Sequence, residues 1–219
     1  MSGRARRRLI WVPIIHTQAD LGSVSGSVKA LHARKTGLGN WDRHVATIDE
    51  FWGRICREIE ALHLDCAKVR LYQDGLPNCG QELRIVKDLV EAGSWNHRLV
   101  LDLVEKGAQL TGTESPELLI EEYELVRGVL KSIEAGGKGE LDKQQAEHSR
   151  DILRKRDRYI AQRIGDTLQA GQTGLIFLGL LHELQTLLPR DIRLNILGQA
   201  AGDARKTPGT ERTLTHDAN

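Results

Sequence analysis

Gly174-Leu-Ile-Phe-Leu-Gly-Leu-Leu181 is the longest uninterrupted apolar run in the chain. It follows Gly171, ends at His182 and Glu183, and has no alternating polar positions. Such a run is typical of a strand buried on both faces of a parallel sheet. It is far shorter than the ~20 residues that a membrane-spanning helix needs. We therefore predict the central strand of a sheet here, and no membrane span.

Four other segments have strand character, and helical segments separate most of them. The strand segments are residues 9–15, 68–73, 108–113 and 192–197. The first is rich in β-branched residues, but Pro13 lacks an amide hydrogen, so we expect this strand to end near it. Strands that alternate with helices favour right-handed crossovers. The predicted fold class is α/β, with a mainly parallel sheet and flanking helices.

The helices are predicted from apolar periodicity and from their end signals. Thr47 and Glu50 form a capping-box pattern that opens a helix over 48–63, and two more helices follow over 81–92 and 96–105. Strongly charged helical segments over 116–134 and 141–170, separated by glycines at 136–139, predict a charged helical hairpin insertion. Its apolar seam packs within the chain or forms a homodimer. The seam consists of Leu118, Leu119, Glu122, Leu125, Val126 and Val129.

Length and composition limit the organisation of the chain. Its 219 residues match one α/β domain, which we place at residues 1–197. Residues 198–219 are small and polar, and we expect them to form a disordered tail. Residues 16–40 are rich in glycine and serine and read as a long loop.

Charge and cysteine content exclude several functional classes. Lys and Arg number 31 against 30 Asp and Glu, a net charge of +1, so neither nucleic acid nor an anionic membrane is an expected partner. Cys56, Cys66 and Cys79 show no CxxC spacing, and the N-terminus lacks the features of a signal peptide. We therefore expect a cytoplasmic protein without disulfides.

Polar residues follow four of the predicted strands. His16 follows the first strand, Asp74 the second, Glu114 the third, and His182 the strand at 174–181. Ligands of open parallel sheets bind beyond the carboxyl ends of the strands, so these residues should meet at one edge. Imidazole and carboxylate groups suit acid–base catalysis or a divalent metal ion such as Zn, Mn or Fe. The candidate metal ligands are His16, His182 and Glu114.

Each candidate also has a structural interpretation. Asp74 precedes Gly75, where aspartate often supports a turn, and Glu114 precedes Ser115-Pro116, where a carboxylate stabilises a helix N-terminus. A single histidine after a strand is more often a core residue than a catalytic one. The charge run from Arg150 to Arg163 reads as a solvated helix face.

Three short segments resemble motifs of the erythromycin esterase, ChaN and TraB superfamily. They are Ile14-Ile-His16, Arg156-Asp-Arg-Tyr-Ile-Ala161 and Gly179-Leu-Leu-His182. That group has two GxxH-like motifs, acidic residues between them, and an arginine on the helix before the last motif, often within R-N-x-x-M-A. Its members share an α/β fold; some are hydrolases, including metal-dependent peptidases, and others associate with haem or have no established activity.

The resemblance implies that His16 and His182 are the motif histidines and Arg156 the motif arginine, with the acidic role on Asp74 or Glu114. The chain departs from the pattern at three positions. Pro13 stands where the family has glycine, and Asp157 and Ile160 replace asparagine and methionine.

Two functional hypotheses follow. The first is hydrolysis of an ester or amide in a small molecule or peptide, assisted by a divalent metal ion or by acid–base catalysis through His16, His182, Asp74 or Glu114. Arg156 would hold an anionic substrate group or stabilise developing negative charge. The second is a non-catalytic module on the same scaffold that binds a small ligand or a protein.

Overall fold

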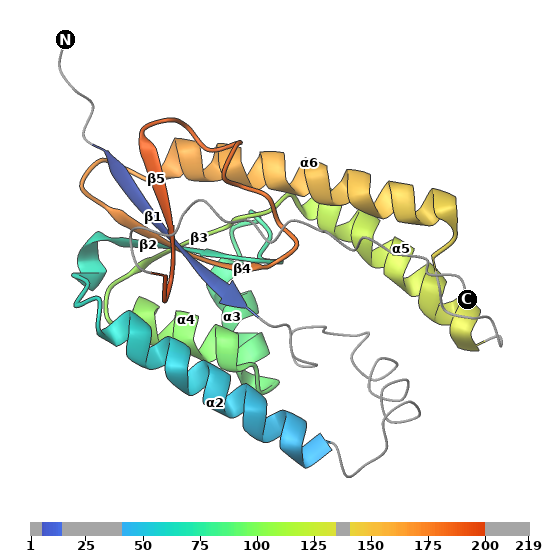
Figure 1. Ribbon diagram of the computed structural model, residues 1–219, viewed down its shortest axis with the longest axis horizontal. Helices are drawn as coiled ribbons and strands as arrows, with labels where there is room; N and C mark the ends of the chain where they lie inside the picture. Colours follow the sequence, from blue (N-terminus) through green and yellow to red (C-terminus); the bar gives the residue numbers. More distant parts are fainter. Residues whose placement is uncertain (1–5, 15–40, 135–140, 200–219) are drawn as a thin grey trace, which may run out of the picture.

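The computed structural model describes residues 6–14, 41–134 and 141–199, with only the backbone for 41–49 and 133–134. Five parallel strands form one sheet in the order β3-β2-β4-β1-β5, and helices cover both of its faces (Figure 1). The predicted α/β class with a parallel sheet is confirmed. The strands are β1 (Arg7–Ile14), β2 (Val69–Gln73), β3 (Gln109–Thr111), β4 (Thr173–Gly179) and β5 (Ile192–Ile196). The helical elements are α2 (Trp41–Glu60), the short η3 (Cys66–Lys68), α3 (Glu82–Glu91), α4 (Trp95–Glu105), α5 (Pro116–Glu134) and α6 (Lys143–Thr167).

The apolar run at 174–181 forms the central strand, as its composition predicts. β4 pairs with β1 on one side and β2 on the other, and its residues 174–178 are buried. The strand ends at Gly179, two residues earlier than predicted. Leu180 and Leu181 leave the sheet and are 74% and 80% exposed, so apolar character alone placed the end of the strand too late.

β1 ends at Ile14, one residue after Pro13, close to where it was expected to end. Pro13 itself stays in the strand because its missing amide hydrogen falls where no partner strand needs it. β5 pairs with β1 only over Arg7–Trp11, and the last bond on that side runs from the Leu197 amide to the Trp11 carbonyl. Backbone groups of residues two apart point to the same side of a strand, so Pro13 faces the side where β5 has already ended. The opposite side of β1 stays paired with β4 as far as Ile14.

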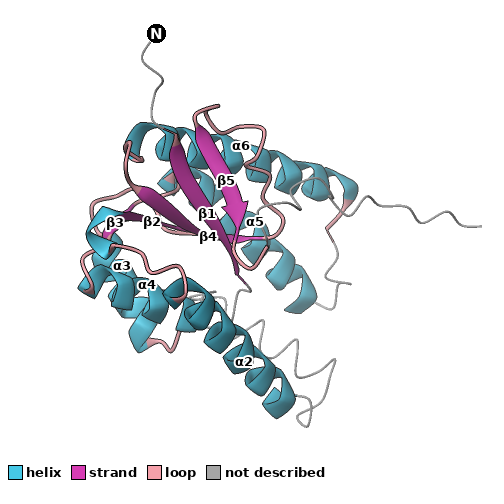
Figure 2. Cartoon of the chain, turned by 60° about the vertical axis from the view of Figure 1, so that its left-hand side comes forward, coloured by secondary structure: helices cyan, strands magenta, loops and turns pink. Residues whose placement is uncertain are grey.

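The sheet separates two apolar cores. α2, α3 and α4 cover one face, and α6 covers the other, as Figure 2 shows. Trp52, Leu71, Val100 and Phe177 belong to the first core. Tyr72, Ile160, Ile164 and Ile176 belong to the second. Alternate residues of β2 and β4 thus enter opposite cores, as expected for a strand buried on both faces.

Helix starts differ in how well the sequence predicts them. α5 begins at Pro116, as predicted from a proline in the first turn. α2 begins at Trp41, so Thr47 lies inside the helix and the predicted capping box there is wrong. The residues 41–47 include no proline or glycine that would stop the helix from extending toward its N-terminus. None of the helices in the described ranges is long and apolar enough to span a membrane.

α5 and α6 pack against each other and form a long helical pair whose far end projects away from the sheet (Figure 1). Several predictions lie outside the described residues: His16, the loop at 16–40, the glycines at 136–139, and most of the predicted tail, from residue 200 onward.

The strand order also indicates where a site should form. From β1 the chain goes to β2, on the far side of β4, and from β4 it goes to β5, on the far side of β1, so the two connections run in opposite directions across the sheet. The carboxyl ends of β1 and β4 therefore lie at a point where the connections leave in opposite directions, which is where open α/β sheets bind ligands.

Candidate functional site

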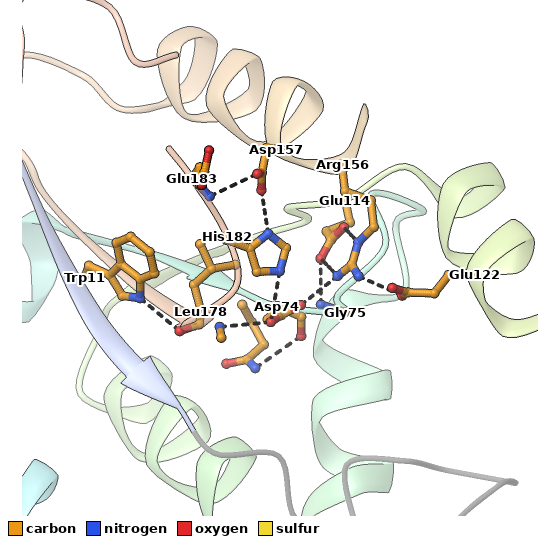
Figure 3. Close-up of polar contacts among 12 residues, drawn as sticks. Trp11, Asp74, Gly75, Glu114, Glu122, Arg156, Asp157, Leu178, His182 and Glu183 are labelled. Carbon is orange, nitrogen blue, oxygen red and sulfur yellow. Dashed lines mark hydrogen bonds and ion pairs between the residues drawn. The ribbon is translucent and has the colours of Figure 1, made fainter. Parts of the chain in front are cut away.

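A cluster of buried ionic side chains lies at this edge of the sheet (Figure 3). Asp74 comes directly after β2, and its amide donates to the carbonyl of Phe177 in β4 at 2.8 Å. Its side chain accepts from the Arg156 Nη2 at 2.7 Å and from the Gly179 amide at 3.0 Å. Asp74 therefore links the ends of β2 and β4 to helix α6, and both of its carboxylate oxygens have a donor.

Glu114 is fully buried beside Asp74. Its backbone is fixed by bonds between its amide and the Leu76 carbonyl and between its carbonyl and the Asn78 amide, at 3.0 and 2.8 Å. Its carboxylate accepts from the Gly75 amide at 2.9 Å. It also accepts from the Arg156 Nη2 at 2.6 Å and from the Arg156 Nε at 2.7 Å. Burial raises the pKa of Glu114 above its ordinary value, although the ion pair with Arg156 opposes that rise.

Arg156 is the centre of the cluster. It lies on α6, is 6% exposed, and contacts three carboxylates, those of Asp74, Glu114 and Glu122. Burial would lower the pKa of Arg156, but the hydrogen bonds and charges of these carboxylates raise it above its ordinary value. The guanidinium is therefore always charged, and most of its donors are already used within the protein.

His182 lies between two carboxylates. Its Nδ1 is 2.5 Å from the Asp157 Oδ1, and its Nε2 is 3.4 Å from the Asp74 Oδ2. Asp157 is itself held by the Glu183 amide, which donates to its second oxygen at 2.9 Å. Burial would lower the pKa of His182, but the bonds to Asp157 and Asp74 raise it to about 9. At neutral pH this ring is a cation with an N–H directed at each carboxylate.

The cluster contains more acid than base. The ion pairs of the cluster join four carboxylates, those of Asp74, Glu114, Glu122 and Asp157, to two cations, Arg156 and His182, so these six groups carry a net charge of −2 when all are ionised. Removing such groups from water costs more than their pairing returns in many proteins. A fold of this size does not need these groups for its core, and perturbed pKa values in such a cluster are typical of functional sites.

The structure brings together four of the five residues predicted from the sequence: Asp74, Glu114, Arg156 and His182. His16 lies outside the described residues. The contacts of Asp74 and Glu114 differ from their structural interpretations: the Asp74 carboxylate accepts from the Gly179 amide and the Glu114 carboxylate from the Gly75 amide, while Ser115 accepts from the Leu118 amide at the start of α5.

Two members of the cluster were missed. The charge run around Asp157 predicts a solvated helix face, yet Asp157 is 4% exposed. Buried positions at Ile152, Arg156, Ile160 and Ile164 recur every four residues on α6, and this spacing places Asp157 beside the buried stripe. Glu122 belongs to the predicted apolar seam, and a carboxylate within such a seam is itself a signal of a cation on the facing helix.

The predicted metal ligands are only partly free to bind an ion. Both oxygens of Glu114 are held by Arg156, and both ring nitrogens of His182 face carboxylates. Among residues 6–14, 41–134 and 141–199, no group of three or more His, Cys, Asp or Glu side chains is arranged to hold a metal ion. The described residues alone therefore do not fit a metal centre, and metal binding stays a prediction that depends on His16.

A shallow cavity lies at the opposite edge of the sheet, between the C-terminal half of α6 and the residues that precede β5. Arg7 lines it, but this guanidinium is bound to Asp191 and to the carbonyls of Gly165 and Leu168. Arg7 thus ties the end of α6 to the sheet, and the cavity contains none of the ionic cluster.

Comparisons with known proteins add no functional assignment: no protein-family model matches the chain, and neither curated proteins nor solved structures give a match.

Proposed function

We propose that this protein hydrolyses an ester or amide at the ionic cluster, with His182 as the proton donor and Asp74 as the proton acceptor. The observation that supports this most is the position of His182, which is held by Asp157 on one ring nitrogen and faces Asp74 with the other. A carboxylate behind a histidine fixes its orientation and stabilises its charged form, as catalysis by histidine requires. The resemblance to the erythromycin esterase, ChaN and TraB superfamily points the same way.

The two ring nitrogens of His182 have different roles in this proposal. The bond from Nδ1 to Asp157 is short and supported by the Glu183 amide, so it holds the ring in place. The Nε2 to Asp74 distance of 3.4 Å is long for a hydrogen bond, so this N–H can be redirected to a substrate at little cost. Nε2 is therefore the atom that would protonate the leaving group.

The proton balance uses only these two residues. A water molecule loses a proton to Asp74 and attacks the carbonyl carbon of the substrate. The bond to the leaving oxygen or nitrogen breaks, and that atom takes the proton from His182 Nε2, giving an acid and an alcohol or amine. Asp74 then returns its proton to His182, which lies 3.4 Å away, and the site is restored.

Arg156 and Glu114 support Asp74 in this reaction. Because Arg156 binds one oxygen of Asp74 and both oxygens of Glu114, it fixes the acceptor carboxylate and balances charge near it. Glu114 accepts two bonds from Arg156 and one from the Gly75 amide, whereas Asp74 lies 3.4 Å from His182 Nε2 and can exchange a proton with it, so Asp74 is the better acceptor. Metal binding through His16, His182 and Glu114 stays a separate prediction, and no step of this mechanism depends on it.

The test is a hydrolysis assay with nitrophenyl esters and coumarin amides of graded chain length. Wild type is compared with His182→Gln, Asp157→Asn and, as a matched control, His148→Gln, whose ring is 45% exposed and pairs with Glu121. We expect H182Q to lose about 100-fold or more in kcat/KM, and H148Q to be unchanged. The wild-type rate should fall as pH rises through about 9, because His182 then loses the proton it must donate.

The proposal fails if the wild type shows no hydrolysis above buffer, or if H182Q keeps full activity with an unchanged circular dichroism spectrum. Elemental analysis of protein purified without chelator tests the metal. Stoichiometric metal that is lost in both His16→Ala and His182→Ala would add a metal centre to the mechanism.

A non-catalytic binding module is the second candidate, and the burial of the cluster favours it. Asp74, Glu114, Arg156, Asp157 and His182 are each no more than 6% exposed. A binding module would show a ligand-dependent rise in Tm without turnover of any substrate in the panel.

A further inference from the structure

The turn that follows β4 carries the two most exposed large apolar side chains of the described residues. Leu180 and Leu181 occupy its two central positions, and the His182 amide closes it by donating to the Gly179 carbonyl at 3.4 Å. The leucines are 74% and 80% exposed, whereas His182 is 6% exposed. The turn therefore directs its apolar residues toward solvent and its histidine toward the ionic cluster.

Leucine is an unusual residue at both central positions of a tight turn. Glycine, proline, asparagine, aspartate and serine are common there, because they supply the required backbone angles or hydrogen bonds. Leu180 and Leu181 do neither, and they belong to neither apolar core. Such departures from local preference are expected where a residue serves function and not folding.

The turn lies beside the proposed proton donor. It continues β4 beyond the carboxyl edge of the sheet, and Figure 3 shows His182 pointing from it toward Asp74 and Asp157. Ligands of open parallel sheets bind at this edge. The atom that takes the proton from His182 Nε2 belongs to the leaving group, so the leaving group is the part of a substrate nearest to the turn.

Size and charge indicate what covers the two leucines. A stable protein–protein interface needs about 20–30 residues on each side, but here the exposed residues that follow the leucines, Glu183, Gln185 and Thr186, are polar. An anionic lipid surface is attracted by basic residues, whereas an acidic residue follows His182. A single apolar chain of a small molecule fits a surface of this size and composition.

The charges of the site also limit the chain. The four carboxylates of the ionic cluster outnumber its two cations, and Arg156 already contacts three of them. A negatively charged group close to His182 is therefore disfavoured. A charge of either sign placed against the two leucines would lose water without gaining a partner. An uncharged chain avoids both costs.

We propose that Leu180 and Leu181 bind an apolar chain on the leaving group of the substrate, so that the protein prefers esters of long-chain alcohols or amides of long-chain amines. This inference rests on the proposed hydrolase function and adds its substrate class. Each methylene that the leucines shield from water should strengthen binding about two- to fourfold. The leucines do not touch the bond that breaks, so the gain should appear in KM.

The test uses esters that carry the same chain on different sides of the bond that breaks. Hexyl acetate has it on the leaving group, its isomer ethyl hexanoate has it on the acyl group, and ethyl acetate lacks it. Acid release is followed by titration at constant pH. For the wild type, we expect kcat/KM for hexyl acetate to exceed the other two values at least about tenfold.

The variant L180S/L181S should lose this preference, and serine is common at turn positions, so the variant should fold. L180M/L181M keeps apolar side chains and should keep the preference. The control L83S/L141S changes leucines that are 42% and 39% exposed and lie outside the turn, and it should behave as the wild type does. Equal values for hexyl acetate and ethyl hexanoate, or a preference that L180S/L181S retains, would overturn the inference.

Binding of alkyl methyl ketones, which have no bond to hydrolyse, separates this inference from the proposed function. By isothermal titration calorimetry, 2-octanone should bind the wild type at least about tenfold more tightly than 2-butanone, and L180S/L181S should not distinguish them. This result without ester hydrolysis would overturn the hydrolase activity and keep the binding site. Loss of phosphatidylcholine vesicle binding in L180S/L181S, with no chain preference in the wild type, would assign the leucines to a lipid surface instead.

Discussion

Arg156 shows how one buried cation can determine the stability of a whole site. It neutralises Asp74 and Glu114, which are 6% and 0% exposed, so its loss would leave two carboxylates buried without their cation. Breaking a buried ion pair by removing one partner is far more costly than never forming it.

We therefore expect Arg156→Met to lower the free energy of unfolding by about 3–5 kcal/mol, measured by urea denaturation at pH 7. Arg156→Lys should lose less, because it keeps the charge but cannot make the paired bonds to Glu114. The control is Arg154→Met, whose side chain is 64% exposed and pairs with Asp151 on the surface. That change should cost less than about 1 kcal/mol. A loss for R156M no larger than for R154M would contradict the central role of Arg156.

At the residue scale, positions after strands predict Asp74, Glu114 and His182, and the family resemblance supplies Arg156 on α6, but the sequence predictions do not include the other two helical members of the cluster. Asp74, Glu114 and His182 were found because parallel strands end at a common edge. Asp157 and Glu122 lie on α6 and α5, where their neighbours are mostly charged or part of an apolar seam. Which face of a long charged helix is buried depends on packing that no local pattern contains.

At the element scale, apolar content predicts where the strands lie, but the residue at which each strand ends depends on the strands paired with it. β4 ends at Gly179 although apolar residues continue, and β1 continues through Pro13 because β5 is shorter than β4. α2 begins six residues before its predicted N-cap, since nothing in residues 41–47 stops a helix. Strand pairing and helix extension are therefore decided by adjacent elements as much as by local sequence.

Substitutions at two glycines distinguish the effect of helix propensity on stability from the effect of a close tertiary contact. A Cβ on Gly128, within α5, would meet nothing within 4 Å, so Gly128→Ala should stabilise the protein by about 0.5–1 kcal/mol. A Cβ on Gly112, between β3 and α5, would lie 2.5 Å from the Asn78 Cα and 2.9 Å from the Pro77 carbonyl oxygen. Because these are backbone atoms, Gly112→Ala must push apart the two segments that hold Glu114.

We expect G112A to lower the unfolding midpoint in thermal denaturation and G128A to raise it. Both changes add one methyl group, so each serves as the control for the other. Midpoints that move in the same direction would show that helix propensity or chain entropy, and not the close approach at Gly112, determines the outcome.

At the scale of the whole molecule, the ionic cluster connects helix α6 to the segments that follow β2, β3 and β4. Asp74 and Glu114 come from the connections after β2 and β3, Arg156 and Asp157 come from α6, and His182 follows β4. The charge state of His182 therefore couples to folding of the entire domain, and this coupling has a defined sign.

The folded pKa of His182, about 9, is higher than its ordinary value of 6.5, so the folded state binds the proton more tightly than the unfolded state. The resulting stabilisation, roughly 3 kcal/mol, is fully present below pH 6.5 and is lost as pH rises through about 9. Urea denaturation between pH 6 and pH 10 should show this fall in the wild type. The range stays below the pKa of Tyr72, which burial raises to about 12.

The variant Asp157→Asn lacks the strongest bond to the imidazolium, so the free energy of unfolding of D157N should change less over the same pH interval. A wild-type free energy of unfolding that is flat from pH 6 to pH 10, or an equal fall in D157N, would mean that Asp157 does not hold the proton on His182.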